Sequence, residues 1–157
     1  MDYSRTELSE RLKEHEGTLE YQEHKNIFRN GLFFPYKDSL GFWTIGYGHL
    51  IKKGESFLKG ITPKEADNLL LQDIAIAELQ IKQLIKEPAS HSAVIQMLLI
   101  EMVFQLGITK AMKFVKFREC VEARDYAGAA RELKSSAWFK QTPNRVQGHI
   151  NVLKLEK

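Results

Sequence analysis

Three side chains in the first third of the sequence could together hydrolyse a glycosidic bond. Glu16 continues the apolar stripe of a short helix, Asp38 begins a turn, and Thr44 follows on a strand. A carboxylic acid in apolar surroundings keeps its proton more readily and can protonate a leaving oxygen. A second, ionised carboxylate and a nearby hydroxyl can hold and activate a water. These residue types therefore suggest acid–base hydrolysis of a sugar linkage.

The first of these residues ends a predicted amphipathic helix. Residues 4–7 fit a capping box that begins this helix, and Gly17 supplies a C-terminal stop. Leu8, Leu12 and Glu16 are four residues apart and share one face. The carboxyl of Glu16 thus lies on an apolar face, which is an unusual place for a solvated charge.

A strand, a turn and a second strand are predicted for residues 32–49. The turn is expected at residues 38–41, and the alternation after it places Trp43 and Ile45 on one face. Thr44 falls on the other face, which we expect to point outward beside a cleft.

The rest of the chain reads as helical. A capping box with proline at the first helical position begins a long helix over residues 62–86, which ends before Pro88. A helix of this length could join two lobes. The expected N-caps of the later helices are Ser90 or Ser92, Thr109, Asp125 and Thr142.

Composition indicates an ordinary globular protein. The 157 residues are 43% hydrophobic and 27% charged, enough for one core or two small lobes. The net charge of +3 is too small to argue for nucleic acid, although it is compatible with an anionic polymer such as a bacterial wall. Cys120 is the single cysteine, so no intrachain disulfide is possible, and we expect it to be a small buried residue.

Neither the N-terminal segment nor the most apolar run of the sequence suggests export or membrane insertion. Residues 1–16 are charged and lack the apolar core of a signal peptide. The most apolar run, residues 93–106, is short and contains polar residues, so we expect a buried helix and no stable membrane insertion. The chain is therefore expected to be made in a cytoplasm and to need another agent for release.

Several strings of residues occur in a characteristic order along the chain. They are Glu16-Gly17, Tyr36-Lys37-Asp38 through Thr44-Ile45-Gly46-Tyr47-Gly48-His49-Leu50, and Trp138 through Gln141-Thr142-Pro143-Asn144-Arg145. Together they resemble the T-even phage type of lysozyme, the muramidase family of phage endolysins. Residues 102–107 are similar to the central helix of that family, and the resemblance runs from about residue 5 to about residue 150.

The resemblance implies an α+β, lysozyme-like fold in a single domain, residues 1–157. A small N-terminal lobe with a β-hairpin covers about residues 17–61. A linking helix covers about residues 62–86. An all-helical C-terminal lobe covers about residues 88–157, and the helix of residues 5–16 is grouped with it.

The resemblance also implies roles for individual residues. Glu16 is the general acid, while Asp38 and Thr44 direct the attacking water. The remaining implied site residues are the sugar contacts Leu50, Phe104 and Gln105, the cleft-mouth residue Arg145, and the stabilising pair His49 and Asp73. No metal site and no cofactor are expected.

The substrate implied by the resemblance is peptidoglycan, cut at the β-1,4 bond between N-acetylmuramic acid and N-acetylglucosamine. An inverting mechanism needs a carboxyl separation of roughly 6.5–9.5 Å, and roughly 5–5.5 Å would indicate retention. We expect a monomer that acts on glycan strands of the wall and not on nucleic acid. It would be made in the host bacterial cytoplasm and act after release, or be carried on the virion.

The sequence departs from the family pattern in places. The link after Glu16-Gly17, residues 18–34, is longer than usual, and Glu20 or Glu23 within it could in principle replace Glu16. This segment could overhang the cleft or bind a partner, whereas the stretch of residues 52–60 is shorter than usual. The substrate subsites could also differ, because the residues Glu101, Phe117 and Glu132 replace those expected from the family.

Two alternative functions stay open at this stage. A lytic transglycosylase needs the acid without a water-activating partner, which would leave Asp38 and Thr44 superfluous. A non-catalytic wall-binding or virion-assembly domain could use the same scaffold, since fold does not fix function.

Overall fold

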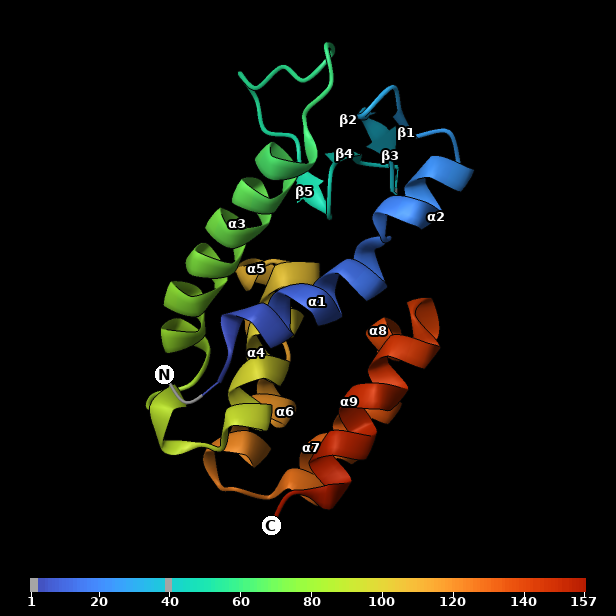
Figure 1. Cartoon of the computed structure of the whole chain (residues 1–157). Helices are drawn as coiled ribbons and strands as arrows, with labels where there is room; N and C mark the ends of the chain where they lie inside the picture. Colours follow the sequence, from blue (N-terminus) through green and yellow to red (C-terminus); the bar gives the residue numbers. More distant parts are fainter. Residues whose placement is uncertain (1–2, 39–40) are drawn as a thin grey trace. The chain divides into compact units, whose positions relative to one another are not determined.

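A computed structural model describes residues 3–38 and 41–157. Short strands lie near the N-terminus and helices make up most of the remainder, so the fold is α+β and lysozyme-like, as the sequence predicts (Figure 1). None of the helices in this described part is long and apolar enough to span a membrane.

Helices and strands follow one another in a simple order. The N-terminal elements are α1 (Arg5–Glu16), α2 (Leu19–His24), β1 (Phe28–Arg29), β2 (Leu32–Phe33), β3 (Tyr36–Lys37), β4 (Trp43–Ile45) and β5 (His49–Leu50). The later helices are α3 (Pro63–Leu84), α4 (Ala93–Leu106), α5 (Ile108–Met112), α6 (Val115–Glu122), α7 (Tyr126–Lys134), α8 (Ala137–Gln141) and α9 (Pro143–Leu155), with a 3₁₀ turn at Pro88–Ser90.

Contacts divide the described residues into two compact units, Ser4–Ala75 and Ile76–Lys157, the second of which includes Tyr3. The long helix α3 belongs partly to each unit. The sequence grouped α1 with the C-terminal lobe, but here it belongs to the N-terminal unit. One reason is that Lys13 forms an ion pair of 2.8 Å with Asp67 on α3. The organisation of residues 1–157 as one domain stays a prediction.

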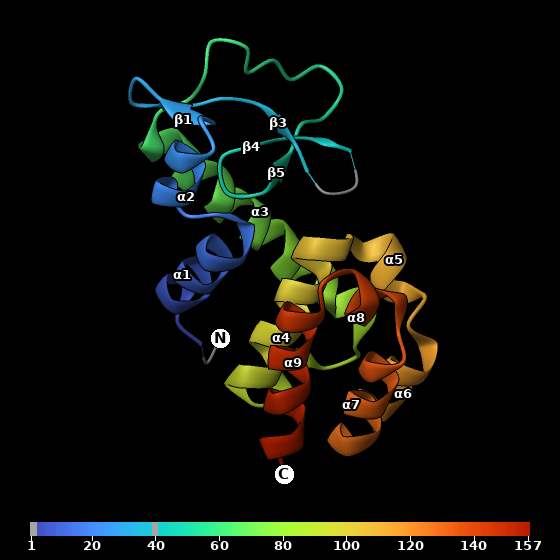
Figure 2. The same cartoon turned by 90° about the vertical axis from the view of Figure 1, so that its right-hand side faces the viewer.

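The N-terminal unit is built around short antiparallel pairings (Figure 2). β1 pairs with β2 through a tight turn at Asn30 and Gly31, which both have positive φ, as a type I′ turn requires. β4 pairs with β3 on one side and with β5 on the other. The core of this unit contains the buried residues Leu8, Leu12, Phe33, Ile45, Ile61, Leu70 and Ile74.

The C-terminal unit is helical. α7 packs against both α6 and α9, and α4 packs against α5 and α9. Trp138 on α8 is buried, and its ring meets the Phe114 ring edge to face at 6.2 Å. Phe117, expected to alter a substrate subsite, is also buried in this core.

Most of the predicted helix boundaries hold. Ser4, Ser92 and Asp125 each accept a hydrogen bond from a backbone N–H in the first turn of α1, α4 and α7. The prediction that Thr109 caps a helix is wrong, because α5 begins at Ile108 and Thr109 lies inside it. The helix expected there is divided into α5 and α6.

The predicted strand pattern is correct in outline and wrong in detail. The first strand is divided, because β2 pairs with β1 while β3 pairs with β4. The second strand ends at Ile45, where Gly46 adopts a positive φ and turns the chain towards β5. Of the predicted turn at residues 38–41, residues 39–40 lie outside the described part of the chain.

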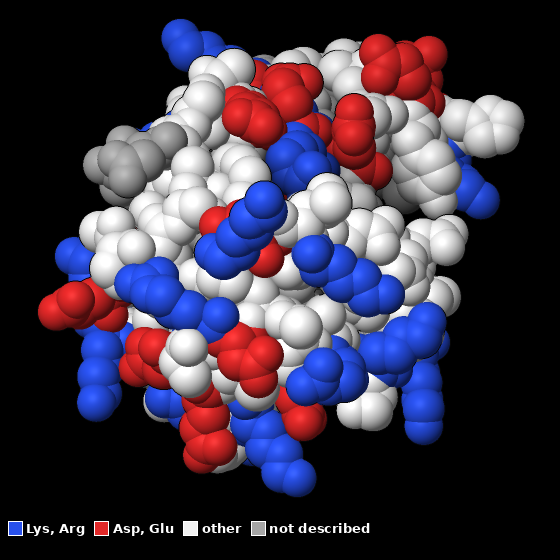
Figure 3. Space-filling view, turned by 90° about the horizontal axis from the view of Figure 1, so that it is seen from below, with Lys and Arg blue, Asp and Glu red and all other residues white. Residues whose placement is uncertain are grey.

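Charges of both signs are interspersed on the face drawn in Figure 3. This agrees with a composition in which 23 lysine and arginine residues nearly balance 20 aspartate and glutamate residues.

Candidate active site

Glu16 is the last residue of α1 and is half-buried. Its carboxyl lies against the backbone of Gly48, at the start of β5. A Cβ placed on Gly48 would come within 2.8 Å of Glu16 Oε2 and 2.9 Å of Cδ. The absence of a side chain at Gly48 therefore lets the hairpin approach the carboxyl of Glu16 closely.

The pKa of Tyr36 on β3 is affected by both candidate carboxylates. Burial raises the pKa of Tyr36, and the negative charges of Glu16 and Asp38 raise it further, while a backbone hydrogen bond from Gly48 opposes the change. The Tyr36 hydroxyl also donates a long hydrogen bond of 3.5 Å to the carbonyl of Gly46. Glu16 at the end of α1 and Asp38 after β3 thus both act on the half-buried Tyr36 side chain.

Asp38 organises the turn between β3 and β4. Its Oδ1 accepts a hydrogen bond of 2.9 Å from the backbone N–H of Phe42, and its own N–H donates to the Phe42 carbonyl. An aspartate that bonds a backbone group a few residues ahead is typical of turns. Here the bond also orients the carboxylate, because one oxygen is held by the main chain.

Thr44 lies on the sheet face that carries Tyr36 and Leu50. The register pairs Thr44 directly with Tyr36 on β3 and with Leu50 on β5, and directly opposed residues share a face. The predicted separation of Thr44 from Trp43 and Ile45 is therefore present. Leu50, the expected sugar contact on this face, is 51% exposed.

The expectation that Thr44 points outward is wrong. Thr44 is 2% exposed, and its Oγ1 donates a hydrogen bond of 3.0 Å to the Phe42 carbonyl. The exposed residue of β4 is instead Trp43, at 55%. Alternation alone could not assign the buried face, because the consecutive residues Thr44 and Ile45 on opposite faces of β4 are both buried.

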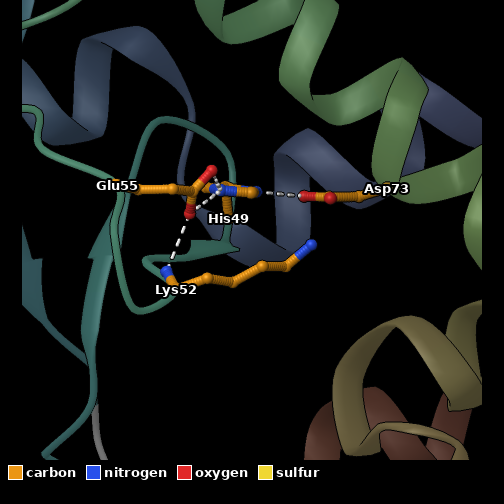
Figure 4. Close-up of polar contacts among 4 residues, drawn as sticks. All are labelled: His49, Lys52, Glu55 and Asp73. Carbon is orange, nitrogen blue, oxygen red and sulfur yellow. Dashed lines mark hydrogen bonds and ion pairs between the residues drawn. The ribbon is translucent and has the colours of Figure 1, made fainter.

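His49 is paired with Asp73, as the resemblance implies. Its Nδ1 lies 2.8 Å from Asp73 Oδ2 on α3, and the ring is 4% exposed (Figure 4). Its Nε2 lies 3.1 Å from Glu55 Oε1, a partner that sequence reasoning did not find. The backbone N–H of Lys52 also donates to Glu55 Oε1, at 2.7 Å.

This arrangement places the imidazole between two carboxylates. The hydrogen bond to Asp73 raises the pKa of His49, against the lowering effect of burial, and Glu55 raises it further. Burial of Glu55 would raise its own pKa, but the Lys52 N–H and the His49 ring together lower it. The cluster is therefore an ion-pair network that joins β5 and the loop after it to α3.

The other predicted residues belong to the C-terminal unit. Phe104 and Gln105 lie in the last turn of α4 and are half-buried, and Gln105 Nε2 donates to Thr142 Oγ1 at 3.3 Å. Arg145 lies in the first turn of α9 and is also half-buried. Their roles towards a sugar or towards Glu16 stay predictions.

The 18–34 segment contributes a residue that sequence reasoning missed. Gln22 on α2 is 1% exposed, and its side-chain amide donates to the carbonyls of Gly17 and Gly46. The alternative acids Glu20 and Glu23 on the same helix are exposed. Of these three glutamates, Glu16 has the partly buried position that a general acid needs.

Within residues 3–38 and 41–157, the side chains of His, Cys, Asp and Glu form no group arranged to hold a metal ion.

Comparisons with known proteins show the family of this chain. The Phage lysozyme family model matches residues 33–152. "Probable T4-type lysozyme 1" and "Probable T4-type lysozyme 2" of Dictyostelium discoideum are 30% and 33% identical to this chain. The first match covers 75% of this chain and 84% of the relative, and the second covers 74% and 83%. A further relative, "Pre-baseplate central spike protein Gp5" of Enterobacteria phage T4, is 31% identical over 70% of this chain and 23% of that protein.

These matches identify the class of protein as a lysozyme, that is, a glycoside hydrolase. The chain belongs to the phage lysozyme family. The matched range contains Asp38, Thr44, His49, Asp73 and Arg145, and it begins after Glu16, at the end of the 18–34 segment.

Proposed function

We propose that this lysozyme cleaves peptidoglycan at the β-1,4 bond between N-acetylmuramic acid and N-acetylglucosamine. The family supports a glycoside hydrolase, and one relative, 27% identical over 73% of this chain and 13% of its own length, is the "Peptidoglycan hydrolase gp36" of Pseudomonas phage phiKMV. The observation that carries the proposal is geometric: the half-buried Glu16 carboxyl lies against Gly48 of the hairpin, and Asp38 is held by the Phe42 N–H in the turn of the same hairpin.

In this mechanism Glu16 gives its proton to the glycosidic oxygen as the bond to the leaving sugar breaks. The Asp38 carboxylate, held by the Phe42 N–H, stabilises the positive charge that develops on the sugar ring. Water attacks the far face of the anomeric carbon, directed by Asp38, and its proton passes to the Asp38 carboxylate. Thr44 is buried and donates its hydroxyl to the Phe42 carbonyl, so it supports the strand beside Asp38 and does not touch the water itself. The product then has inverted configuration.

The test compares the wild type with Glu16→Gln on purified cell walls. The amide keeps the size of the side chain but has no proton to give, so we expect turbidity loss to slow by at least about 100-fold. Equal clearing by the two proteins, or no clearing by either, would remove the assignment of Glu16 as the acid.

Analysis of the products separates hydrolysis from the alternatives. We expect new reducing ends whose first-formed anomer is α, detected by proton NMR soon after mixing. Products ending in 1,6-anhydro sugars would establish a lytic transglycosylase. Binding to walls without any released sugar would establish a non-catalytic domain.

We also propose that the chain acts on the wall of a bacterial host as a monomer. It would be made in the host cytoplasm and reach the wall after release. Alternatively it would reach the wall on a virion, as the name of the spike-protein relative suggests. Light scattering after size exclusion tests the oligomeric state, with 18.1 kDa expected.

A further inference from the structure

Gln22 is buried on a helix that is otherwise exposed. Its neighbours Tyr21 and Glu23 face solvent, whereas Gln22 itself is 1% exposed. Thr18 caps this short helix, since its Oγ1 accepts from the Tyr21 N–H at 3.2 Å. The cap fixes α2 directly after α1, and the Gln22 side chain therefore points into the unit.

The Gln22 amide bridges two main-chain segments. Its Nε2 donates to the Gly17 carbonyl at 2.9 Å and to the Gly46 carbonyl at 2.9 Å. An amide nitrogen carries two hydrogens, so both are used, and because both partners are acceptors the nitrogen must face them. Gly17 ends α1 with a positive φ of 110°, where a helix carbonyl needs a partner from elsewhere.

The two carbonyls belong to the two main-chain segments that adjoin the candidate acid. Gly17 directly follows Glu16, and Gly46 lies two residues before Gly48, whose backbone touches the Glu16 carboxyl. The same Gly46 carbonyl accepts the long hydrogen bond from Tyr36. The Gln22 side chain thus connects the end of α1, which carries Glu16, to the hairpin segment of residues 46–48, which the Glu16 carboxyl contacts.

We propose that Gln22 is a positioning residue that sets Glu16 against the hairpin. It is supplied by the 18–34 segment, which lies largely before the range matched by the family model. This inference rests on the proposed function, because it assigns Gln22 to the geometry of the acid named there. Gln22 acts through the backbone at Gly17 and Gly46 and is not itself a proton donor.

The expected effect follows from the sensitivity of catalysis to geometry. Displacement of a reacting group by about 1 Å can cost about 100-fold in rate even when the mutated residue is remote. Loss of the bridge frees Gly17 from Gly46, so Glu16 is no longer held at its distance from Gly48. Binding of sugar by exposed residues such as Leu50 would be unaffected.

The experiment compares Gln22→Met with Gln96→Met. Gln96 is a matched control, because it is 3% exposed, donates from Nε2 to the His91 carbonyl at 2.8 Å, and lies in the C-terminal unit. Both variants lose a buried amide bond of the same kind. We expect Gln22→Met to lower kcat by about 10- to 100-fold with little change in KM, and Gln96→Met to keep both constants within about 3-fold.

The outcomes separate this inference from the proposed function. If wild type releases no reducing ends, the proposed function fails. If wild type hydrolyses the wall and Gln22→Met has the same kcat as Gln96→Met, the positioning role is wrong, and Gln22 only stabilises the fold. Circular dichroism at the assay temperature confirms that both variants are folded.

A second variant covers the case in which Gln22→Met does not fold. A protonated carboxyl in Gln22→Glu can still donate one hydrogen bond, whereas the ionised form repels both carbonyls. We expect its kcat, relative to wild type, to fall as the pH rises while circular dichroism still reports a folded chain. A constant ratio across the pH range would overturn the proposal.

Discussion

Gly48 allows the hairpin to touch Glu16 because it has no side chain. Its φ of +84° is unfavourable for other residues, and a Cβ would overlap the Glu16 carboxyl. Gly54, in the loop after β5, has a similar φ of +92° but nothing within 4 Å of its Cβ position. An alanine at either position would adopt an unfavourable φ, but only an alanine at Gly48 would also collide with Glu16. Comparison of the two variants therefore separates the effect of backbone strain from the effect of the collision.

We therefore expect Gly48→Ala to impair catalysis and Gly54→Ala to leave it unchanged. Each variant loses about 1–2 kcal/mol of unfolding free energy through its positive φ. In Gly48→Ala the Glu16 carboxyl must also move, which lowers kcat by about 10-fold or more. Measurement of kcat and of urea unfolding tests this, and equal kcat values for the two variants would contradict it.

The His49 cluster predicts a pH-dependent stability. The pKa of His49 is raised in the folded state above its unfolded value of about 6.5. Its contribution is therefore fully present below about pH 6.5 and is lost as the pH rises through the folded pKa. In Asp73→Asn, which lacks the carboxylate that pairs with His49 Nδ1, we expect about 1–3 kcal/mol less stability near pH 6 and a weaker dependence on pH.

Urea unfolding at several pH values measures this dependence. Glu55 contributes in the opposite direction, because its lowered pKa gives stability that is lost only as the pH falls below about 4.5. A wild-type stability that rises between pH 6.5 and 9, or the same slope in Asp73→Asn, would contradict the role given to the pair.

At the residue scale, the sequence predicted contacts of residues that belong to a recognisable family motif. His49 and its partner Asp73 followed from a resemblance, and the contact is present. Glu55 was not found because it lies in the irregular loop after β5, and Gln22 because its partner Gly46 is 24 residues away along the chain. A single glutamine on a polar helix has no periodicity that could indicate burial.

Helix caps show how far local chemistry determines an element. Thr62 Oγ1 accepts from the Glu65 N–H at 3.2 Å, and Glu65 Oε1 accepts from the Thr62 N–H at 3.1 Å, which completes the capping box of α3. Thr109, which has the same residue type and was expected to cap a helix, lies exposed inside α5.

We expect Thr62→Ala to cost about 1 kcal/mol of unfolding free energy, because an N–H in the first turn of α3 loses its partner. Thr109→Ala should be neutral within about 0.5 kcal/mol or slightly stabilising, since alanine favours the interior of a helix. Thermal unfolding of the two variants measures the difference. A similar loss in both would contradict the assignment of the cap.

At the element scale the helices were predictable and the strands were less so. The long helix and the caps of α1, α4 and α7 follow from 3.6-residue periodicity and from side chains within four positions. The strands are only two or three residues long, too short for alternation to define a boundary or a buried face. This is why Thr44 was assigned to the correct face and yet expected to be exposed.

Each compact unit contains a buried histidine, and the pKa shifts of the two histidines have opposite directions. His91 in the C-terminal unit is 5% exposed, and its Nδ1 lies 2.7 Å from the Tyr126 hydroxyl and 3.1 Å from Arg124 Nη1. Burial and the Arg124 charge lower its pKa. Its contribution to stability is present above about pH 6.5 and is lost as the pH falls, the reverse of His49.

We therefore expect the units to respond in opposite directions to pH. Between pH 5.5 and 8, protection of amides against hydrogen exchange should decrease near His49 and increase near His91, after correction for the intrinsic exchange rate. Mass spectrometry of peptic fragments resolves the two regions. Parallel changes in both units would contradict the assigned pKa directions.

The Gln22 bridge also limits how the family can change its chain length. If residues 18–34 were trimmed to the shorter link that the family resemblance implies, the carbonyls of Gly17 and Gly46 would lose their shared donor, and the Gly46 carbonyl would lose it in a buried position. Evolutionary gain or loss of this segment must therefore coincide with compensating substitutions beside the acid. Transfer of this segment to a relative should preserve activity only when the residues that contact it beside Glu16 are transferred as well.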